Sequence, residues 1–217
     1  MSSMTANAAV KPRFRGVLHE RAFFVSLVVG ALLVAAAPTP RAIAAMAIFA
    51  VSVSALLGVS ALYHRHDWSD KARRWMRRLD HSMIFVLIAG TYTPFALLVL
   101  EGTFANVILA VVWIGALAGS LVELVLADAS KWIMASICVA LGWISVVAVP
   151  QIAKDIGTAG TAMLAAGGVA YTAGAVIYAT KKPNPSPTVF GYHEIFHALV
   201  VLAIALQYAV IAFFVLP

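Results

Sequence analysis

Seven apolar runs, each close to the length of a membrane-crossing helix, dominate this chain of 217 residues. A helix needs about 20 residues to cross the roughly 30 Å hydrocarbon core, and it satisfies its backbone hydrogen bonds internally. The runs lie near residues 22–37, 42–63, 80–100, 104–127, 132–150, 160–180 and 193–216. They predict an all-α polytopic membrane protein with seven transmembrane helices.

The composition excludes a soluble domain. Hydrophobic residues make up 63% of the chain and charged residues 11%, whereas soluble domains have roughly 45–50% and 25%. Because the connections are short, we expect a cytoplasmic N-terminal segment, residues 1–21, followed by one transmembrane domain, residues 22–217. The first run ends in Ala35-Ala36-Ala37, like a signal-peptide cleavage site. Pro38 directly follows and disfavours cleavage, so we interpret this run as a retained helix.

The basic residues predict the orientation. Thirteen of the fifteen Lys and Arg fall on one side of a seven-span topology, and only Arg41 and Lys154 fall on the other. By the positive-inside rule the N-terminus is cytoplasmic and the C-terminus is outside. The formal net charge of +6 is thereby explained without a nucleic-acid partner. Residues 64–79 hold Trp68, Trp75 and a basic cluster, so we expect an amphipathic connection lying on the anionic inner leaflet.

Ionisable residues inside the bilayer are costly and usually functional, and five polar residues share one depth. Ser60 and His64 are four apart at the end of the second run, and therefore lie on one helix face. Asp80 begins the third run, while His193 and His197 are four apart at the start of the seventh. The topology places all five at the cytoplasmic ends of their helices, so three distant segments converge there.

Three imidazoles with an open fourth position are typical of catalytic zinc. His64, His193 and His197 are therefore candidate zinc ligands, and the metal would activate a water molecule at neutral pH. Asp80 would orient or deprotonate that water. Ser60, one turn deeper, could hydrogen-bond the water or a developing oxyanion.

The remaining ionisable residues gain no such support from the sequence. His19 and His66 lie among basic or polar interfacial residues, and His81 points about 100° away from Asp80 on the same helix; we interpret all three as structural. For Glu123, near the end of the fourth run, we favour snorkelling to the interface, with a role near the metal as the alternative.

The stretch from His193 to His197, "HEIFH", matches the zinc-protease signature H-E-x-x-H, in which the Glu is the general base. The best-placed third ligand is His64, far upstream. Intramembrane metalloproteases carry the H-E-x-x-H motif early and an Asp-containing motif later, whereas here "LDH" at residues 79–81 comes first. We therefore disfavour a protease and read the motif as H-x-x-x-H.

Together these motifs resemble the hemolysin III family, within the progestin and adiponectin receptor superfamily. The resemblance rests on "SALYH" (60–64), "RRLDHSMIFVLIAGTYTPF" (77–95) and "HEIFH", and extends over essentially all seven spans. It implies that His64, His193 and His197 are zinc ligands, that Asp80 and Ser60 act beside them, and that Glu194 is not required. It also implies a bacterial plasma-membrane location.

Two classes of function follow from the resemblance. Animal relatives are linked to hydrolysis of ceramide-type lipid amides, so the leading hypothesis is a zinc-dependent hydrolase of a lipid amide or ester, with membrane lipids entering laterally. The bacterial branch is named for haemolytic activity, so the alternative is a pore-forming, cytolytic protein. A third hypothesis is a receptor or lipid-homeostasis regulator with structural zinc.

Overall fold

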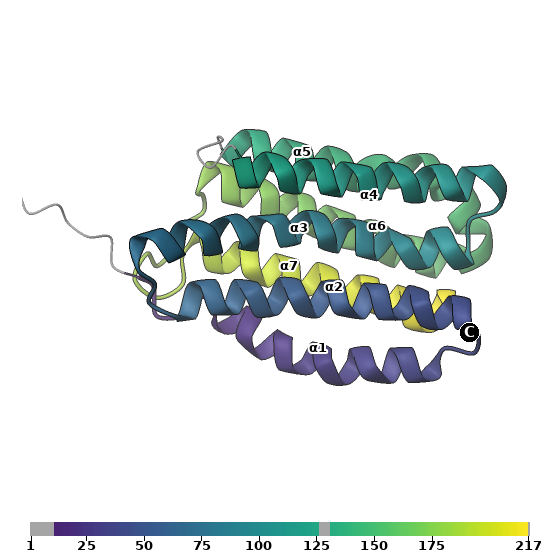
Figure 1. The fold of residues 1–217 in the computed structure, drawn as a ribbon, viewed down its shortest axis with the longest axis horizontal. Coiled ribbons are helices and arrows are strands. Elements are labelled where there is room, and N and C mark those ends of the chain that lie inside the picture. Colours follow the sequence, from purple (N-terminus) through teal and green to yellow (C-terminus); the bar gives the residue numbers. More distant parts are fainter. Residues whose placement is uncertain (1–10, 126–130, 217) are drawn as a thin grey trace, which may run out of the picture.

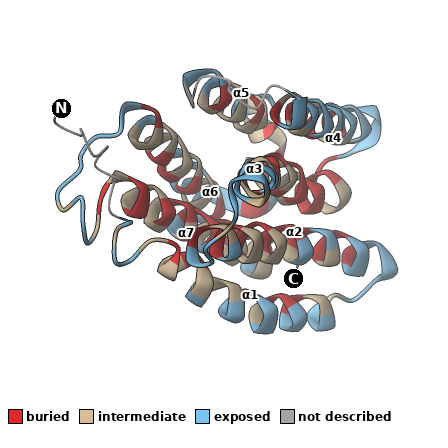
Figure 2. Cartoon of the chain, turned by 60° about the vertical axis from the view of Figure 1, so that its left-hand side comes forward, coloured by how far each residue is buried: buried red, intermediate tan, exposed pale blue. Residues whose placement is uncertain are grey.

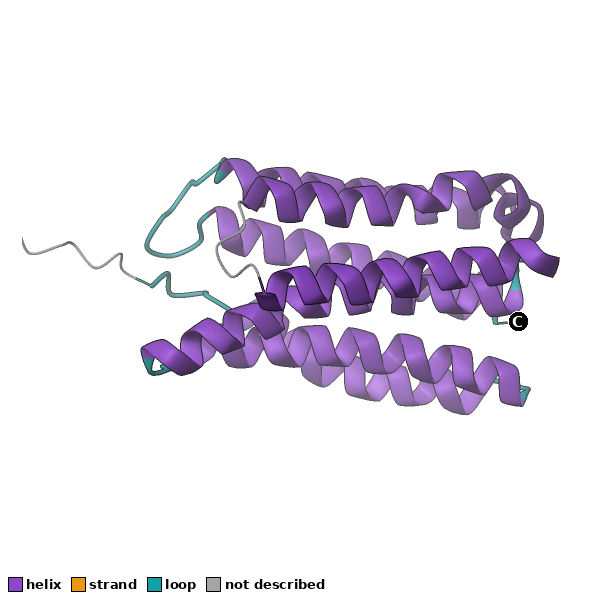
Figure 3. Cartoon of the chain, turned by 45° about the horizontal axis from the view of Figure 1, so that its top comes forward, coloured by secondary structure: helices purple, strands orange, loops and turns teal. Residues whose placement is uncertain are grey.

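A computed structural model describes residues 11–125 and 131–216, and these ranges are helical, with no strand (Figure 3). The elements are α1 (Val17–Ala36), α2 (Pro40–Arg65), α3 (Asp70–Leu98), α4 (Gly102–Val125), α5 (Lys131–Trp143), the 3₁₀ segment η1 (Ile144–Ala148), α6 (Val149–Thr180), α7 (Tyr192–Val210) and the π-helical turn η2 (Ile211–Val215). The expectation of an all-α fold is met throughout the described ranges.

Six stretches of the described chain are long and apolar enough to cross a membrane, which supports a polytopic membrane protein. The sequence predicted seven. The difference lies in Trp132–Thr180, a stretch of 49 residues that joins the fifth and sixth predicted runs. It is interrupted by η1 and by Gly157, whose φ of +66° and ψ of −177° are not helical.

Helix ends follow local chemistry. At α2 the Thr39 hydroxyl accepts a hydrogen bond from the Ala42 N–H, and Pro40 takes the first helical position, where its missing N–H costs nothing. α3 begins at Asp70, so much of the connection predicted at 64–79 is helix. The Arg78 guanidinium lies 4.9 Å from the centre of the Trp75 ring within this first part of α3.

The helices run side by side in an elongated bundle (Figure 1). The end of α2 and the beginnings of α1, α3 and α7 lie together at one end, which we call the histidine end. Buried residues face the spaces between helices, and the outer faces are exposed (Figure 2). α2 and α3 approach closely at Gly90, where a Cβ atom would lie 2.0 Å from the Ser52 hydroxyl oxygen.

The segment 11–16, which precedes α1, crosses the histidine end. Its backbone bonds the α6–α7 connection, with the Arg13 N–H donating to the Thr188 carbonyl at 2.9 Å. Gly16 has a φ of +78°, and a Cβ there would lie 2.7 Å from the Cβ of His64. Only glycine adopts this conformation readily and fits this contact. The segment therefore lies directly against α2 at His64.

Candidate metal centre

Three buried histidines meet at the histidine end of the bundle. The last turn of α2 supplies His64, and the first two turns of α7 supply His193 and His197 on one helix face. One ring nitrogen from each lies within 4.8 Å of the other two, and Nε2 of His64 is 3.1 Å from Nε2 of His193. The cluster could bind a metal ion, as expected from the sequence.

The two predicted partners of this cluster lie beside it. The Asp80 carboxylate, from α3, is 3.7 Å from Nε2 of His64. The Ser60 hydroxyl, one turn before His64 on α2, lies beside the Asp80 carboxylate. Both residues are buried. Both side chains therefore lie beside the cluster, and the roles predicted for them stay predictions.

His19 corrects one expectation from the sequence. It is not an interfacial residue, because it is only 2% exposed and its ring stacks on that of His197. The ring centres are 3.8 Å apart and the planes differ by 9°. Imidazole lone pairs lie in the ring plane, so an ion held in the plane of the His197 ring would lie well outside the stacked plane of His19. His19 therefore supports His197 rather than joining the same ligand set. Neither nitrogen of His19 has a hydrogen-bond partner.

Glu123 corrects a second expectation. It does not snorkel to the interface: it is 3% exposed, and its carboxylate lies 2.6 Å from Nδ1 of His81. Nε2 of His81 is in turn 3.3 Å from the Tyr178 hydroxyl. This Glu–His–Tyr chain joins α4, α3 and α6 next to the three-histidine cluster. His66, by contrast, is exposed and packs on Trp68, as expected of an interfacial residue.

Glu194 has a structural role that explains its presence between the histidines. Its Oε1 atom accepts a 2.6 Å hydrogen bond from Nε of Arg15, and Oε2 accepts one from the Gly191 N–H at 2.8 Å. The second bond is the Glu half of a capping box and satisfies the N-cap N–H at the start of α7. Both carboxylate oxygens are thereby used in holding the helix and the N-terminal segment, which supports reading the motif as H-x-x-x-H.

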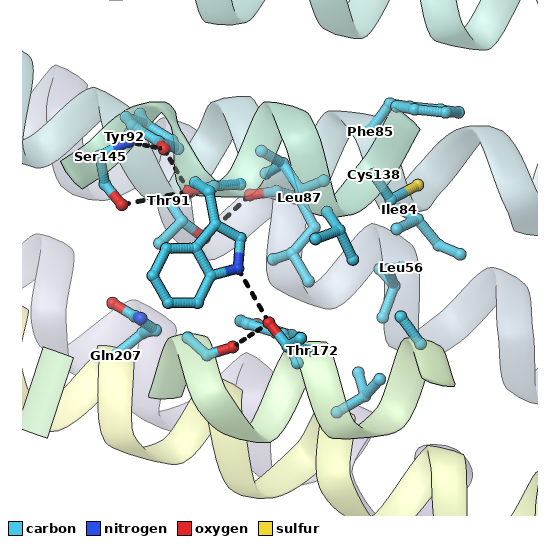
Figure 4. Close-up of a pocket in the computed structure, with 18 of the residues that line it drawn as sticks. Leu56, Ile84, Phe85, Leu87, Thr91, Tyr92, Cys138, Ser145, Thr172 and Gln207 are labelled. Atoms are coloured by element: carbon cyan, nitrogen blue, oxygen red, sulfur yellow. Dashed lines mark hydrogen bonds between the residues drawn. The ribbon is translucent and has the colours of Figure 1, made fainter. Parts of the chain in front are cut away.

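A cavity of about 530 Å³ leads from the cluster along the bundle, between α3, α5, α6 and α7. Near the cluster its wall includes Asp80, His193 and His197, and farther along it is mainly apolar (Figure 4). Trp143 and Val169 line the cavity and are also exposed on the outer surface of the bundle. The wall of the cavity therefore includes exposed residues on a side of the bundle that would face lipid.

The fold and this centre define a class: a polytopic helical membrane protein with a buried three-imidazole cluster at the head of an apolar cavity. Comparison with known proteins places it more narrowly. A family model described as "Haemolysin-III related" matches residues 7–208. The chain belongs to this family, which confirms the resemblance seen in the sequence.

Two bacterial relatives illustrate the match. The chain is 32% identical to Hemolysin-3 of Bacillus cereus over 181 residues, which cover 82% of this chain and 78% of that protein. It is 31% identical to the Hemolysin-3 homolog of Bacillus subtilis (strain 168) over 172 residues, covering 79% and 78% respectively.

Proposed function

We propose that this protein is a zinc-dependent hydrolase that cleaves an amide or ester bond of a membrane lipid. The observation that carries the proposal is the position of three buried imidazoles at the head of an apolar cavity whose wall includes the exposed residues Trp143 and Val169. A lipid entering from the membrane beside these two residues would bring its polar head to the histidines and leave its chain in the cavity.

The donor set suits zinc. Neutral imidazole is a favoured zinc ligand, and nitrogens bound tetrahedrally at 2.0–2.1 Å lie about 3.3 Å apart. The separation of 3.1 Å between Nε2 of His64 and Nε2 of His193 is close to this value. The full set spans up to 4.8 Å, so binding would draw the third imidazole inward. His64, His193 and His197 would hold the ion.

Zinc at an open three-histidine site supplies Lewis acidity that polarises a carbonyl group. Asp80 would accept the proton of the attacking water and pass it to the leaving group, since its carboxylate lies beside His64. The Ser60 hydroxyl, which lies beside Asp80, would hold its carboxylate in place by hydrogen bonding. His19 would keep the ring of His197 fixed by stacking.

We further infer seven passes, with the N-terminus in the cytoplasm and the C-terminus outside a bacterial plasma membrane. As one straight helix, the 49 residues of Trp132–Thr180 would extend about 74 Å, more than twice the hydrocarbon thickness. The breaks at η1 and Gly157 allow this stretch to cross twice. The asymmetry of basic residues supports the orientation. Reporter fusions at the C-terminus test it: reporter activity on the cytoplasmic side would overturn the orientation.

Metal analysis and turnover test the main proposal. The purified protein should hold one zinc per chain and release fatty acid from a lipid amide such as a ceramide. The variant His64→Ala/His193→Ala/His197→Ala should lose the zinc, whereas the exposed His66→Ala serves as a matched control and should keep it. Undiminished zinc in the triple variant would refute the site, and stoichiometric zinc without turnover of any lipid would refute the hydrolase.

The names of the relatives favour a second function, cytolysis. Liposome leakage separates the two. Leakage that survives both chelation and His64→Ala would favour a pore over a hydrolase. If removing the metal lowers only the thermal stability, and neither leakage nor turnover is observed, the zinc is structural, as in a receptor or regulator of lipid homeostasis.

A further inference from the structure

Two polar atoms deep in the apolar part of the cavity lack hydrogen-bond partners: Oε1 of Gln207 and the hydroxyl oxygen of Tyr171. Both residues line the cavity, and Gln207 is only 5% exposed. Figure 4 shows the Gln207 side chain beside the cavity, on the side opposite Phe85 and Cys138. Buried polar groups are nearly always paired, so each of these two calls for an explanation.

Three polar side chains in the apolar part of the same wall, those of Thr91, Thr172 and Trp143, already have partners within the protein. The Thr91 hydroxyl donates to the Leu87 carbonyl at 2.8 Å, and the Thr172 hydroxyl donates to the Gly168 carbonyl at 2.8 Å. The indole N–H of Trp143 donates to the Thr172 oxygen at 3.0 Å. The unpaired atoms of Gln207 and Tyr171 therefore stand out within this wall.

The packing of α6 against α7 fixes the depth of the two residues. A Cβ at Gly174 would lie 3.3 Å from the Phe196 ring, and one at Gly167 would lie 2.8 Å from the Gln207 amide nitrogen. Tyr171 lies between these two glycines in sequence, and so between these two levels. Gln207 follows His197 by ten residues, which places it about 15 Å farther along the helix axis.

We propose that Gln207 and Tyr171 form a subsite for a hydroxyl group on the acyl chain of the lipid whose head lies at the three histidines. The inference deepens the proposed function and rests on it for the position of the head. A hydroxyl group both donates and accepts, so it can donate to Oε1 of Gln207 and accept from the Tyr171 O–H. A plain methylene chain would leave both atoms unpaired.

The depth selects the position of the hydroxyl on the chain. An extended chain advances roughly 1.2 Å per bond, so about 12 bonds separate the head from the level of Gln207. The subsite therefore favours a fatty acyl group hydroxylated in mid-chain over one hydroxylated next to the head. The commonest alternative occupant of such a site is a buried water, which would make the same hydrogen bonds.

Fatty-acid binding tests the subsite without relying on turnover. The purified chain, both chelator-treated and zinc-loaded, is titrated with 12-hydroxyoctadecanoic, 2-hydroxyoctadecanoic and unsubstituted octadecanoic acid in competition with a fluorescent fatty acid. We expect the 12-hydroxy acid to bind roughly tenfold more tightly than the unsubstituted acid. The 2-hydroxy acid should gain no such advantage, because its hydroxyl lies at the head.

Variants locate the effect. In Gln207→Leu and Tyr171→Phe the preference should disappear or reverse, because the chain hydroxyl then enters an apolar wall with fewer partners. Thr91→Val is the matched control: it also removes a polar group from the wall, but one that is already bonded, so the preference should remain. Octadecanoic acid should bind each variant that folds, which reports that the cavity is intact.

Equal affinity of the wild-type protein for the 12-hydroxy and unsubstituted acids would overturn the subsite and leave water as its occupant. Failure of all three acids to bind would overturn it as well, together with the acyl cavity. A preference that survives in Gln207→Leu/Tyr171→Phe would also overturn the assignment. Because chelated protein is included, a missing zinc or a missing hydrolase activity affects the proposed function and not this outcome.

Discussion

The contact between α2 and α3 at Gly90 should be among the least tolerant of substitution. In Gly90→Ala the new methyl group would lie 2.0 Å from the Ser52 hydroxyl oxygen and 2.6 Å from the Ser52 Cβ. Ordinary carbon contacts need about 3.5–4.0 Å. The second atom is attached to the backbone, so a rotamer change of Ser52 relieves only part of the clash, and the helices must separate.

Overpacking of this kind typically costs 1–3 kcal/mol, and we expect about 3 kcal/mol because the Cβ of Ser52 cannot move without α2. For a chain of this size that corresponds to a fall in melting temperature of about 6–12 °C. α2 carries His64 and α3 carries Asp80, so the zinc content should fall as well. Tryptophan fluorescence on heating in detergent measures the first effect, and metal analysis the second.

Changes at Ser52 should relieve the clash in steps. In Gly90→Ala/Ser52→Ala the oxygen is gone but the Cβ remains, so the double variant should recover only part of the loss. In Gly90→Ala/Ser52→Gly the next neighbour is the Ile48 carbonyl oxygen at 3.6 Å, an ordinary contact. That double variant should recover the stability of Ser52→Gly alone.

Gly168→Ala is the control, since nothing lies within 4 Å of a Cβ there. An unchanged melting temperature in Gly90→Ala would refute the reasoning, and so would a loss that Ser52→Gly leaves uncorrected.

Three further outcomes are expected. His19→Phe should keep the stacking contact and the zinc while removing two unpartnered nitrogens, so its thermal stability should equal or exceed that of the wild type. In His19→Ala the free energy of unfolding should fall by about 2–3 kcal/mol. A His19→Phe variant less stable than the wild type would contradict this. Glu194→Gln should retain full zinc, but its free energy of unfolding should fall by about 1–3 kcal/mol because the ion pair with Arg15 is lost; thermal unfolding measures this. Loss of turnover with unchanged stability would instead indicate a catalytic role for Glu194. Lowering the pH from 7 to about 5 should release zinc reversibly, because protons compete with the metal for imidazole nitrogens. Dialysis followed by metal analysis measures the release. A zinc content that does not change with pH would show that other ligands hold the ion.

Much of the fold followed from the apolar runs, because the bilayer imposes the length and regularity of each helix. The sequence indicated one interruption of Trp132–Thr180, because the predicted runs 132–150 and 160–180 leave a gap that contains Lys154 and Gly157. It could not show the 3₁₀ segment η1 (Ile144–Ala148), which lies inside an apolar run. The start of α1 was also placed too late. The first turns of α1 contain polar residues such as His19, so they fall outside the apolar run, and packing against α7 compensates for the burial of His19.

The centre was predictable where spacing and topology agreed. His64, His193 and His197 each lie at a helix end on the same side, so their convergence followed from the direction of the spans. The contacts of His19 and Glu123 could not be predicted in this way, because each depends on the rotation of its helix about its own axis. For Glu123 there was a signal: His81 lies on the adjacent run at a similar depth, and an opposite partner makes a buried carboxylate tolerable.

The segment 11–16 also determines how molecules can reach the histidines. It lies against His64 at Gly16, its Arg15 is paired with Glu194, and its backbone is bonded to the loop that precedes α7. A molecule that approaches the three histidines from the histidine end of the bundle therefore meets the segment 11–16 first. In the proposed function, lipid enters instead beside Trp143 and Val169, which line the cavity and are exposed. Membrane composition, rather than the solute content of the adjoining compartment, would then govern what occupies this cavity.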